Sequence, residues 1–100
     1  MTELTLAGAL EEIMLIQQTG SRVGMCGTRA GRITVDAGGV MVGVDVCPLC
    51  DGTVHRGFLL VRHDDGRSVR VDMAAFHNVA VGHPMPGLAT EQLIGIVADR

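Results

Sequence analysis

Short runs of alternating apolar and polar residues fill the middle of the chain, and they constrain its fold more than any other feature. Alternation with a period of two is typical of β-strands that bury one face, and glycines separate the runs. Because the links between the runs are short, we expect neighbouring strands to be antiparallel. The expected strands are Arg22–Cys26, Arg32–Asp36, Val40–Cys47, Thr53–His63 and Arg67–Met73.

Helical spacing of apolar residues occurs near both ends of the chain. Apolar residues three and four positions apart predict a first helix of about 14 residues, with Thr5 as its N-cap and Gly20 just beyond its end. A second helix is predicted after Thr90, its expected N-cap. A chain of 100 residues has the size of one domain. The sequence therefore predicts a single α+β domain over residues 1–100: an N-terminal helix, an antiparallel meander or small barrel of about five strands, and a C-terminal helix.

The dipeptide Asp65-Gly66 is the strongest turn signal in the chain and predicts a two-residue type I′ turn between the last two strands. This register places Phe58 opposite Met73 and separates an apolar face from a mixed one, as a half-buried strand pair requires. A three-residue loop, Asp64-Asp65-Gly66, would shift the register by one residue, and we prefer the two-residue turn. The predicted apolar face consists of Phe58, Leu60, Val69, Val71 and Met73.

A Cys-x-x-Cys motif links two of the predicted strands, within the segment Cys47-Pro48-Leu49-Cys50-Asp51-Gly52. A turn of this kind directs two sulfurs toward one point, which is the arrangement that a tetrahedral Zn²⁺ ion requires. This segment is similar to the knuckles of zinc ribbons and rubredoxins. Those families supply a second Cys-x-x-Cys, which this sequence lacks, so a site with four cysteine ligands is excluded.

Histidines are the expected source of the remaining ligands. If the last strand pair continues past Met73, His77 lies opposite Val54 and close to the knuckle. His63 belongs to the other end of the same hairpin, about 25 Å away at ~3.3 Å per residue, and is not a ligand. His83, between a glycine and a proline, is the expected fourth ligand. We therefore predict a zinc site formed by Cys47, Cys50, His77 and His83.

Alternatives to this ligand set remain open. Cys26 in place of His83 is the main variant. His55 is a further candidate, expected to orient a ligand rather than to bind the metal. The competing interpretation is that the two cysteines of the motif are small buried core residues with no metal between them.

Composition limits the classes of function. The formal net charge is −3, the 8 basic residues are all arginine, and the chain has neither tryptophan nor tyrosine. Nucleic-acid binding is therefore not expected, because it needs positive charge and stacking aromatics. The one feature that favours nucleic-acid binding is an edge that carries Arg22, Arg29 and Arg32.

The expected location is the cytoplasm. The acidic start of the sequence is unlike a secretory signal, and no apolar stretch is long enough for a membrane span. The 3 cysteines are an odd number, which favours reduced thiols or metal ligands over a disulfide framework. The composition, rich in arginine, glycine and alanine, suggests a bacterial or phage origin.

The leading functional hypothesis is a small non-catalytic interaction or regulatory module with a structural Cys/His zinc site. The terminal helices carry more apolar surface than one small sheet needs, which predicts a protein partner or a homodimer. The first alternative is an enzyme that uses Cys47 and Cys50 in thiol exchange or around an open metal site. No catalytic motif supports it, and Asp51 is expected to raise the pKa of the thiols. The second alternative is a nucleic-acid-binding small barrel.

Overall fold

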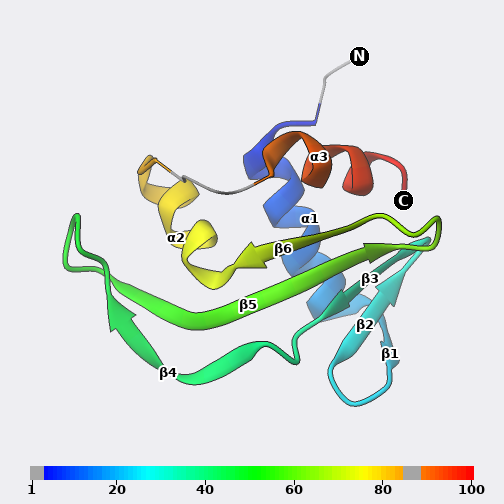
Figure 1. Ribbon diagram of the computed structural model, residues 1–100, viewed down its shortest axis with the longest axis horizontal. Coiled ribbons are helices and arrows are strands. Elements are labelled where there is room, and N and C mark those ends of the chain that lie inside the picture. The colour runs from blue at the N-terminus through cyan, green and yellow to red at the C-terminus, as the bar shows by residue number, and fades with distance from the viewer. Residues whose placement is uncertain (1–3, 85–88) are drawn as a thin grey trace.

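The computed structural model describes residues 4–84 and 89–100 (Figure 1). Its helices are α1 (Leu6–Thr19), α2 (Met73–Val81) and α3 (Thr90–Ala98). Its strands are β1 (Ser21–Val23), β2 (Gly27–Ala30), β3 (Ile33–Asp36), β4 (Val40–Val46), β5 (Thr53–His63) and β6 (Ser68–Asp72). The predicted α+β class is confirmed: α1 precedes a curled antiparallel sheet in the sequence, and α2 and α3 follow it.

Strand β5 organises the sheet, whose order is β1-β2-β3-β5-β4, with β6 also paired to β5. β3 pairs with residues 60–63 of β5, with Ile33 opposite His63. β4 pairs with residues 53–57 of β5, with Val46 opposite Thr53. Only residues 37–39 separate β3 from β4, so the two form one interrupted strand along β5. β6 pairs with residues 58–62 of β5.

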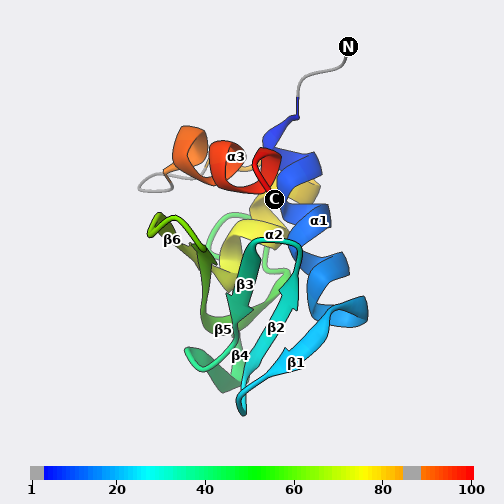
Figure 2. The ribbon, with the colours of Figure 1, turned by 90° about the vertical axis from the view of Figure 1, so that its right-hand side faces the viewer.

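The buried core lies between the helices and one part of the sheet. Figure 2 shows α1 beside β1, β2 and β3, with α3 crossing near the start of α1. β4 contributes nothing to this core, since all of its 7 residues are exposed. The buried core residues are Ala9, Leu10, Ile13, Ile16, Ile33, Val35, Leu59, Val61, Val69, Val71, Ala75, Leu93, Ile96 and Val97.

The first helix is confirmed in its bounds and its caps. α1 has 14 residues, and the Oγ1 atom of Thr5 accepts a hydrogen bond from the N–H of Gly8 at 3.1 Å. Gly20 follows the helix, and its N–H donates to the carbonyl of Ile16. The second predicted helix is also present, but Ala89 occupies its N-cap and Thr90 is its first helical residue.

The expected strand Arg22–Cys26 is wrong. Gly24 has φ 66°, a left-handed conformation that favours glycine, and the chain turns over residues 24–26. This turn splits the region into the short hairpin β1–β2, in which Val23 lies opposite Gly27. The sheet therefore has 6 strands, one more than the predicted number of about five.

The predicted register of the β5–β6 hairpin is wrong by one residue. Phe58 lies opposite Asp72, and the loop has the three residues Asp64-Asp65-Gly66. The loop is stabilised because the N–H of Gly66, at φ 100°, donates to the carbonyl of His63 at 3.0 Å. The buried face is consequently Leu59, Val61, Val69 and Val71, whereas Phe58 and Leu60 are only half-buried.

A helix replaces the strand extension that was predicted beyond Met73. α2 begins at Met73, so Val54 and His77 do not pair as strand neighbours. Gly82 ends this helix at φ 78°, and its N–H donates to the carbonyls of Asn78 and Val79. The predicted final strand thus ends at Asp72, one residue early.

Candidate metal centre

The turn between β4 and β5 forms a closed loop around the Cys-x-x-Cys motif. The N–H of Cys47 donates to the carbonyl of Gly52 at 2.7 Å, and the N–H of Asp51 donates to the carbonyl of Cys47 at 2.9 Å. Asp51 adopts φ 57°, a left-handed conformation that aspartate tolerates better than most residues. These contacts hold the backbone so that both sulfurs face α2. Cys47 is buried and Cys50 is exposed.

The second half of the site comes from α2 and the residues that follow it. His77 lies within the helix, and His83 lies directly after the left-handed Gly82. The N–H of His83 donates to the carbonyl of Asn78 at 2.8 Å, which closes the helix end in the manner of a Schellman motif. This hydrogen bond fixes the backbone of His83 relative to His77.

The four residues converge on one point. The Sγ atom of Cys50 is 3.3 Å from Nε2 of His77, and the Sγ atom of Cys47 is 3.6 Å from Nδ1 of His83. All four donor atoms lie within 4.8 Å of one another. A tetrahedral zinc ion with its usual bond lengths separates its ligand atoms by about 3.3–3.8 Å. The two sulfur–nitrogen distances lie within this range, and the other donor atoms are near enough for small shifts to place all four around one ion.

Gly52 leaves the space that the His77 ring occupies. A Cβ atom at this position would lie 2.8 Å from Cε1 of His77 and 3.3 Å from the sulfur of Cys50. The first distance is too short for a real contact, so a side chain at residue 52 would displace the imidazole. The site therefore requires a glycine after the knuckle, beyond the two cysteines themselves.

The electrostatics of the knuckle favour a thiolate at Cys47. The backbone N–H of Leu49, directed at the sulfur, lowers the pKa of the Cys47 thiol below its ordinary value. The charge of Asp51 acts in the opposite direction, as the sequence predicts, but it is the smaller effect. The predicted effect of Asp51 on the pKa of Cys47 is therefore confirmed in direction, but the backbone hydrogen bond outweighs it. A thiolate is also the form that binds a metal ion.

The other candidate ligands lie outside this group. Cys26 is exposed in the β1–β2 turn, and His55 is exposed on β5, opposite Val44. His63 is buried near the other end of β5, where its Nε2 atom lies 2.9 Å from the carbonyl oxygen of Asp99. Over residues 4–84 and 89–100, only Cys47, Cys50, His77 and His83 form a group that could hold a metal ion.

Sequence reasoning missed two residues that shape the site, Gly52 and Gly82. The signal for Gly82 was present, because a glycine after an alanine-rich apolar segment is a common helix end. That signal would have indicated α2 and placed His77 and His83 on one helix end. The need for glycine at residue 52 carries no such signal, because it depends on the approach of a distant imidazole.

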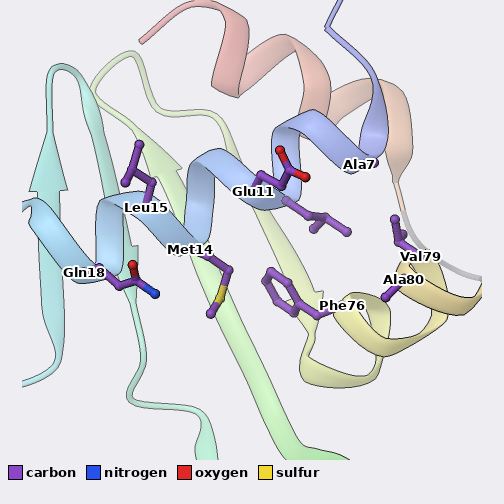
Figure 3. Close-up of a pocket in the computed structure, with 9 residues that line it drawn as sticks. Ala7, Glu11, Met14, Leu15, Gln18, Phe76, Val79 and Ala80 are labelled. Atoms are coloured by element: carbon purple, nitrogen blue, oxygen red, sulfur yellow. The ribbon is translucent and has the colours of Figure 1, made fainter.

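A separate apolar groove of about 400 Å³ lies between α1 and α2 (Figure 3). Met14 and Leu15 line it from α1, and Phe76 and Val79 line it from α2. Glu11 is among its polar lining residues, and the groove contains none of the four candidate metal ligands. The groove exposes a part of the apolar surface of α1, and another face of this helix is buried in the core.

The arginine edge that motivated the nucleic-acid hypothesis is partly neutralised. Arg29 forms an ion pair with Asp64, and its Nη1 atom donates to Oδ1 of that residue at 2.8 Å. The same interaction raises the pKa of Arg29 and lowers that of Asp64. Of the three arginines, Arg29 is thus paired with an acidic residue of the same chain.

Comparison with protein-family models, with curated proteins and with solved structures finds no match for this chain. Within the described ranges, no helix has the length and apolar character needed to cross a membrane.

Proposed function

We propose that this protein is a small non-catalytic interaction module in which a structural zinc ion joins the β4–β5 turn to α2. One observation carries the metal part of the proposal. Two thiols and two imidazoles, from segments about 30 residues apart in sequence, bring four donor atoms within 4.8 Å of one another. Packing does not account for three of the four residues, because Cys50 is exposed and both histidines are half-buried, and only Cys47 is buried.

The donor set favours zinc in a structural role. Thiolate and imidazole ligands suit Zn²⁺ better than the oxygen-preferring Mg²⁺ or Ca²⁺. Two cysteines and two histidines complete a tetrahedron, so no position stays open for a water or a substrate. A closed site of this kind contributes folding free energy rather than catalysis.

The zinc ion would anchor a part of the sheet that the core does not hold. β4 is exposed along its whole length, whereas α2 is attached to the core through Ala75 and Phe76. Ligands from both elements would therefore tie the exposed hairpin to the buried part of the molecule.

A second candidate function is thiol exchange by Cys47 and Cys50. The lowered pKa of Cys47 favours it, because the thiolate is the reactive form. Against it, Cys47 is buried at 3% exposure, so an incoming disulfide has little access to the sulfur. The effect of removing Cys50 on the stability of the fold distinguishes the two functions.

The interaction part of the proposal rests on exposed apolar surface. α1 keeps Met14 and Leu15 exposed beside the groove, and β4 keeps several valines exposed. The partner is another protein or a second copy of the chain. All three cysteines are free, which supports a reducing compartment such as the cytoplasm.

Zinc content and unfolding temperature test the metal part directly. Elemental analysis of the purified protein is expected to give one zinc per chain. Cys50→Ser is expected to lose the zinc and to lower the Tm by roughly 10 °C, because about 2 kcal/mol of stability has that effect in a domain of this size. Cys26→Ser is the matched control and should keep both the zinc and the Tm, since Cys26 lies outside the group.

The opposite pattern would support thiol exchange instead. A protein without zinc, in which Cys50→Ser leaves the Tm unchanged and abolishes disulfide reduction, contradicts the structural-zinc proposal.

A further inference from the structure

Exposed apolar residues are concentrated in one part of the sheet, which we call the β4 arm: β4, the knuckle turn and the first half of β5, residues 40–57. Six of the eleven large apolar residues that are exposed within the described ranges belong to it. They are Val40, Met41, Val42, Val44, Val46 and Leu49. Val42 is 98% exposed, and Val46 is 65% exposed.

β4 also has a free edge. It pairs only with β5, and among the described residues no strand bonds to the backbone groups on its other side, where only the N–H of Val40 has a partner, the carbonyl of Ala37 in the preceding turn. Edge strands of natural proteins are usually protected by lysine, proline, β-bulges or inward-pointing charges. β4 has a bulge between Met41 and Val44, but it has no proline or basic residue, and its one charged residue, Asp45, is paired with Arg56 at 3.0 Å.

We propose that β4 pairs in an antiparallel manner with β4 of a second copy of this chain, about a two-fold axis. This inference names the surface and the partner of the interaction module proposed above, and it does not depend on the metal. Free N–H and C=O groups of each strand would bond to those of the other, and the exposed valines would pack across the new strand pair.

Charge and symmetry favour a second copy as the occupant. A two-fold interface brings the same surface of each chain together, so the surface must be complementary to itself. β4 meets this condition, because its one charged residue, Asp45, is neutralised by Arg56 within its own chain. The remaining charged residue of the arm, Asp51, lies in the knuckle turn beyond the strand.

A standard interface sets the area that the contact must supply. The accessible surface of the chain is 6238 Å², and a standard interface takes about 800 Å² from each partner, roughly one eighth of that total. The 7 exposed residues of β4 and the exposed Leu49 would supply a part of this area.

A bulge in β4 restricts how the two copies can align. The register with β5 shifts between Met41 and Val44, where Gly43 has φ 99°. A bulge bends the strand and interrupts its ladder, so the straight segments on either side can match in few registers. The bulge therefore favours a defined dimer over open-ended stacking of strands.

The oligomeric state of the full chain tests this proposal. Sedimentation equilibrium is expected to show a dimer for the wild type. Val44→Lys should raise the dimer Kd by about 100-fold, because two lysines would meet across the axis. Val46→Lys is a second variant of the same strand and covers the case in which Val44→Lys does not fold.

Two control variants locate the interface. Met25→Lys changes a residue that is 94% exposed in the β1–β2 turn, and it should leave the Kd unchanged. Met14→Lys changes the α1–α2 groove and should also leave it unchanged. A dimer that survives both β4 variants, or that Met14→Lys abolishes, overturns the proposal in favour of another surface.

A chain that stays monomeric at millimolar concentration also overturns the proposal. This holds even if β4 then pairs with a strand of a different protein. Zinc content is measured on the same samples. A zinc-loaded monomer contradicts only the dimer, and a zinc-free dimer contradicts only the metal site.

Discussion

At the scale of single residues, the two glycines beside the candidate metal centre act in different ways. Gly52 provides space, because the imidazole of His77 occupies the volume that a side chain would need. Gly82 provides a backbone conformation, since its φ of 78° lets the chain turn and direct His83 back toward the knuckle. Neither residue has a side chain to bind a metal, yet both determine where a ligand lies.

Gly52→Ala is expected to weaken zinc binding by about tenfold or more, because second-layer changes around a metal site have effects of this size. The added methyl group would displace His77 from its present position. Competition with a chromophoric chelator measures the affinity. Gly95→Ala is the control: a Cβ at residue 95 has only Arg67 nearby, at 3.7 Å, so zinc affinity should not change. Equal affinities in wild type and Gly52→Ala would contradict the ligand role of His77.

The sequence could predict some of the site's residues but not the geometry that unites them. Cys47 and Cys50 follow from their spacing and from the turn residues around them. His77 was predicted from a strand pairing that does not form, and it reaches the knuckle on α2 instead. His83 was predicted from its place between a glycine and a proline, and it lies just beyond the end of that helix. The structure brings all four together, and their binding of a metal stays a prediction.

At the scale of elements, the β5–β6 hairpin shows why a turn was predicted but its register was not. Asp65-Gly66 fits both a two-residue and a three-residue loop, since each needs a glycine with positive φ. The choice depends on side chains. Asp65 accepts a hydrogen bond from the N–H of Arg67 at 3.0 Å, and the ring of His63 accepts one from the N–H of Asp65 at 3.1 Å. These contacts favour the longer loop.

The stability of this hairpin is expected to depend on pH through Asp65. Hydrogen bonds from Arg67 lower the pKa of Asp65 to about 2 in the folded protein, below its ordinary value of 3.8. The folded state therefore favours the charged carboxylate, and this stabilisation is complete above about pH 4 and disappears as the pH falls toward 2. Asp65→Asn removes the charge but keeps an oxygen that can accept from the N–H of Arg67.

Urea unfolding of both proteins between pH 7 and pH 2 measures the effect. The wild type should have the higher midpoint near neutral pH, and the difference should close below about pH 4. High salt should reduce the difference at neutral pH, because the carboxylate is 44% exposed and is screened. A difference that stays constant down to pH 2 would contradict the ion pair as its source.

The helices differ in how much of them the sequence could predict. α1 is long, amphipathic and capped by Thr5, so its bounds were predicted closely. α2 has 9 residues, and seven of them are apolar or alanine, which leaves little periodicity to identify. Its helical state is set by Gly82 at its end and by the packing of Ala75 into the core. The first is a local signal in the sequence, whereas the second depends on tertiary structure.

At the scale of the whole molecule, the buried core and the candidate metal centre lie in different parts. The core is enclosed by α1, α3, β2, β3, β6 and the second half of β5, whereas the β4 arm extends from it (Figure 1). Only the helix α2 and the strand β5 belong to both parts. The two parts are therefore stabilised by different interactions, apolar burial in one and the proposed metal ligation in the other.

Removal of the metal should consequently affect one part of the molecule first. Treatment with a strong chelator is expected to increase hydrogen exchange by at least about tenfold in residues 40–56 and 77–83. Amides of α1, β3 and the second half of β5 should keep their protection, because Ile13, Val35 and Leu59 stay buried. Mass spectrometry of peptides from both regions measures this. Uniform loss of protection over the chain would contradict a local role of the metal.

The length of β5 limits the insertions and deletions that this chain can tolerate. Its 11 residues extend over about 36 Å, close to the 37 Å of the longest dimension of the molecule. One end begins just after the two thiols, and the other ends at His63 beneath the C-terminal helix. Insertion or deletion of a single amino acid would reverse which side of the sheet the following side chains face. The residue count of this central strand is therefore fixed from both directions, whereas loops that contribute nothing to the candidate metal centre can vary in length.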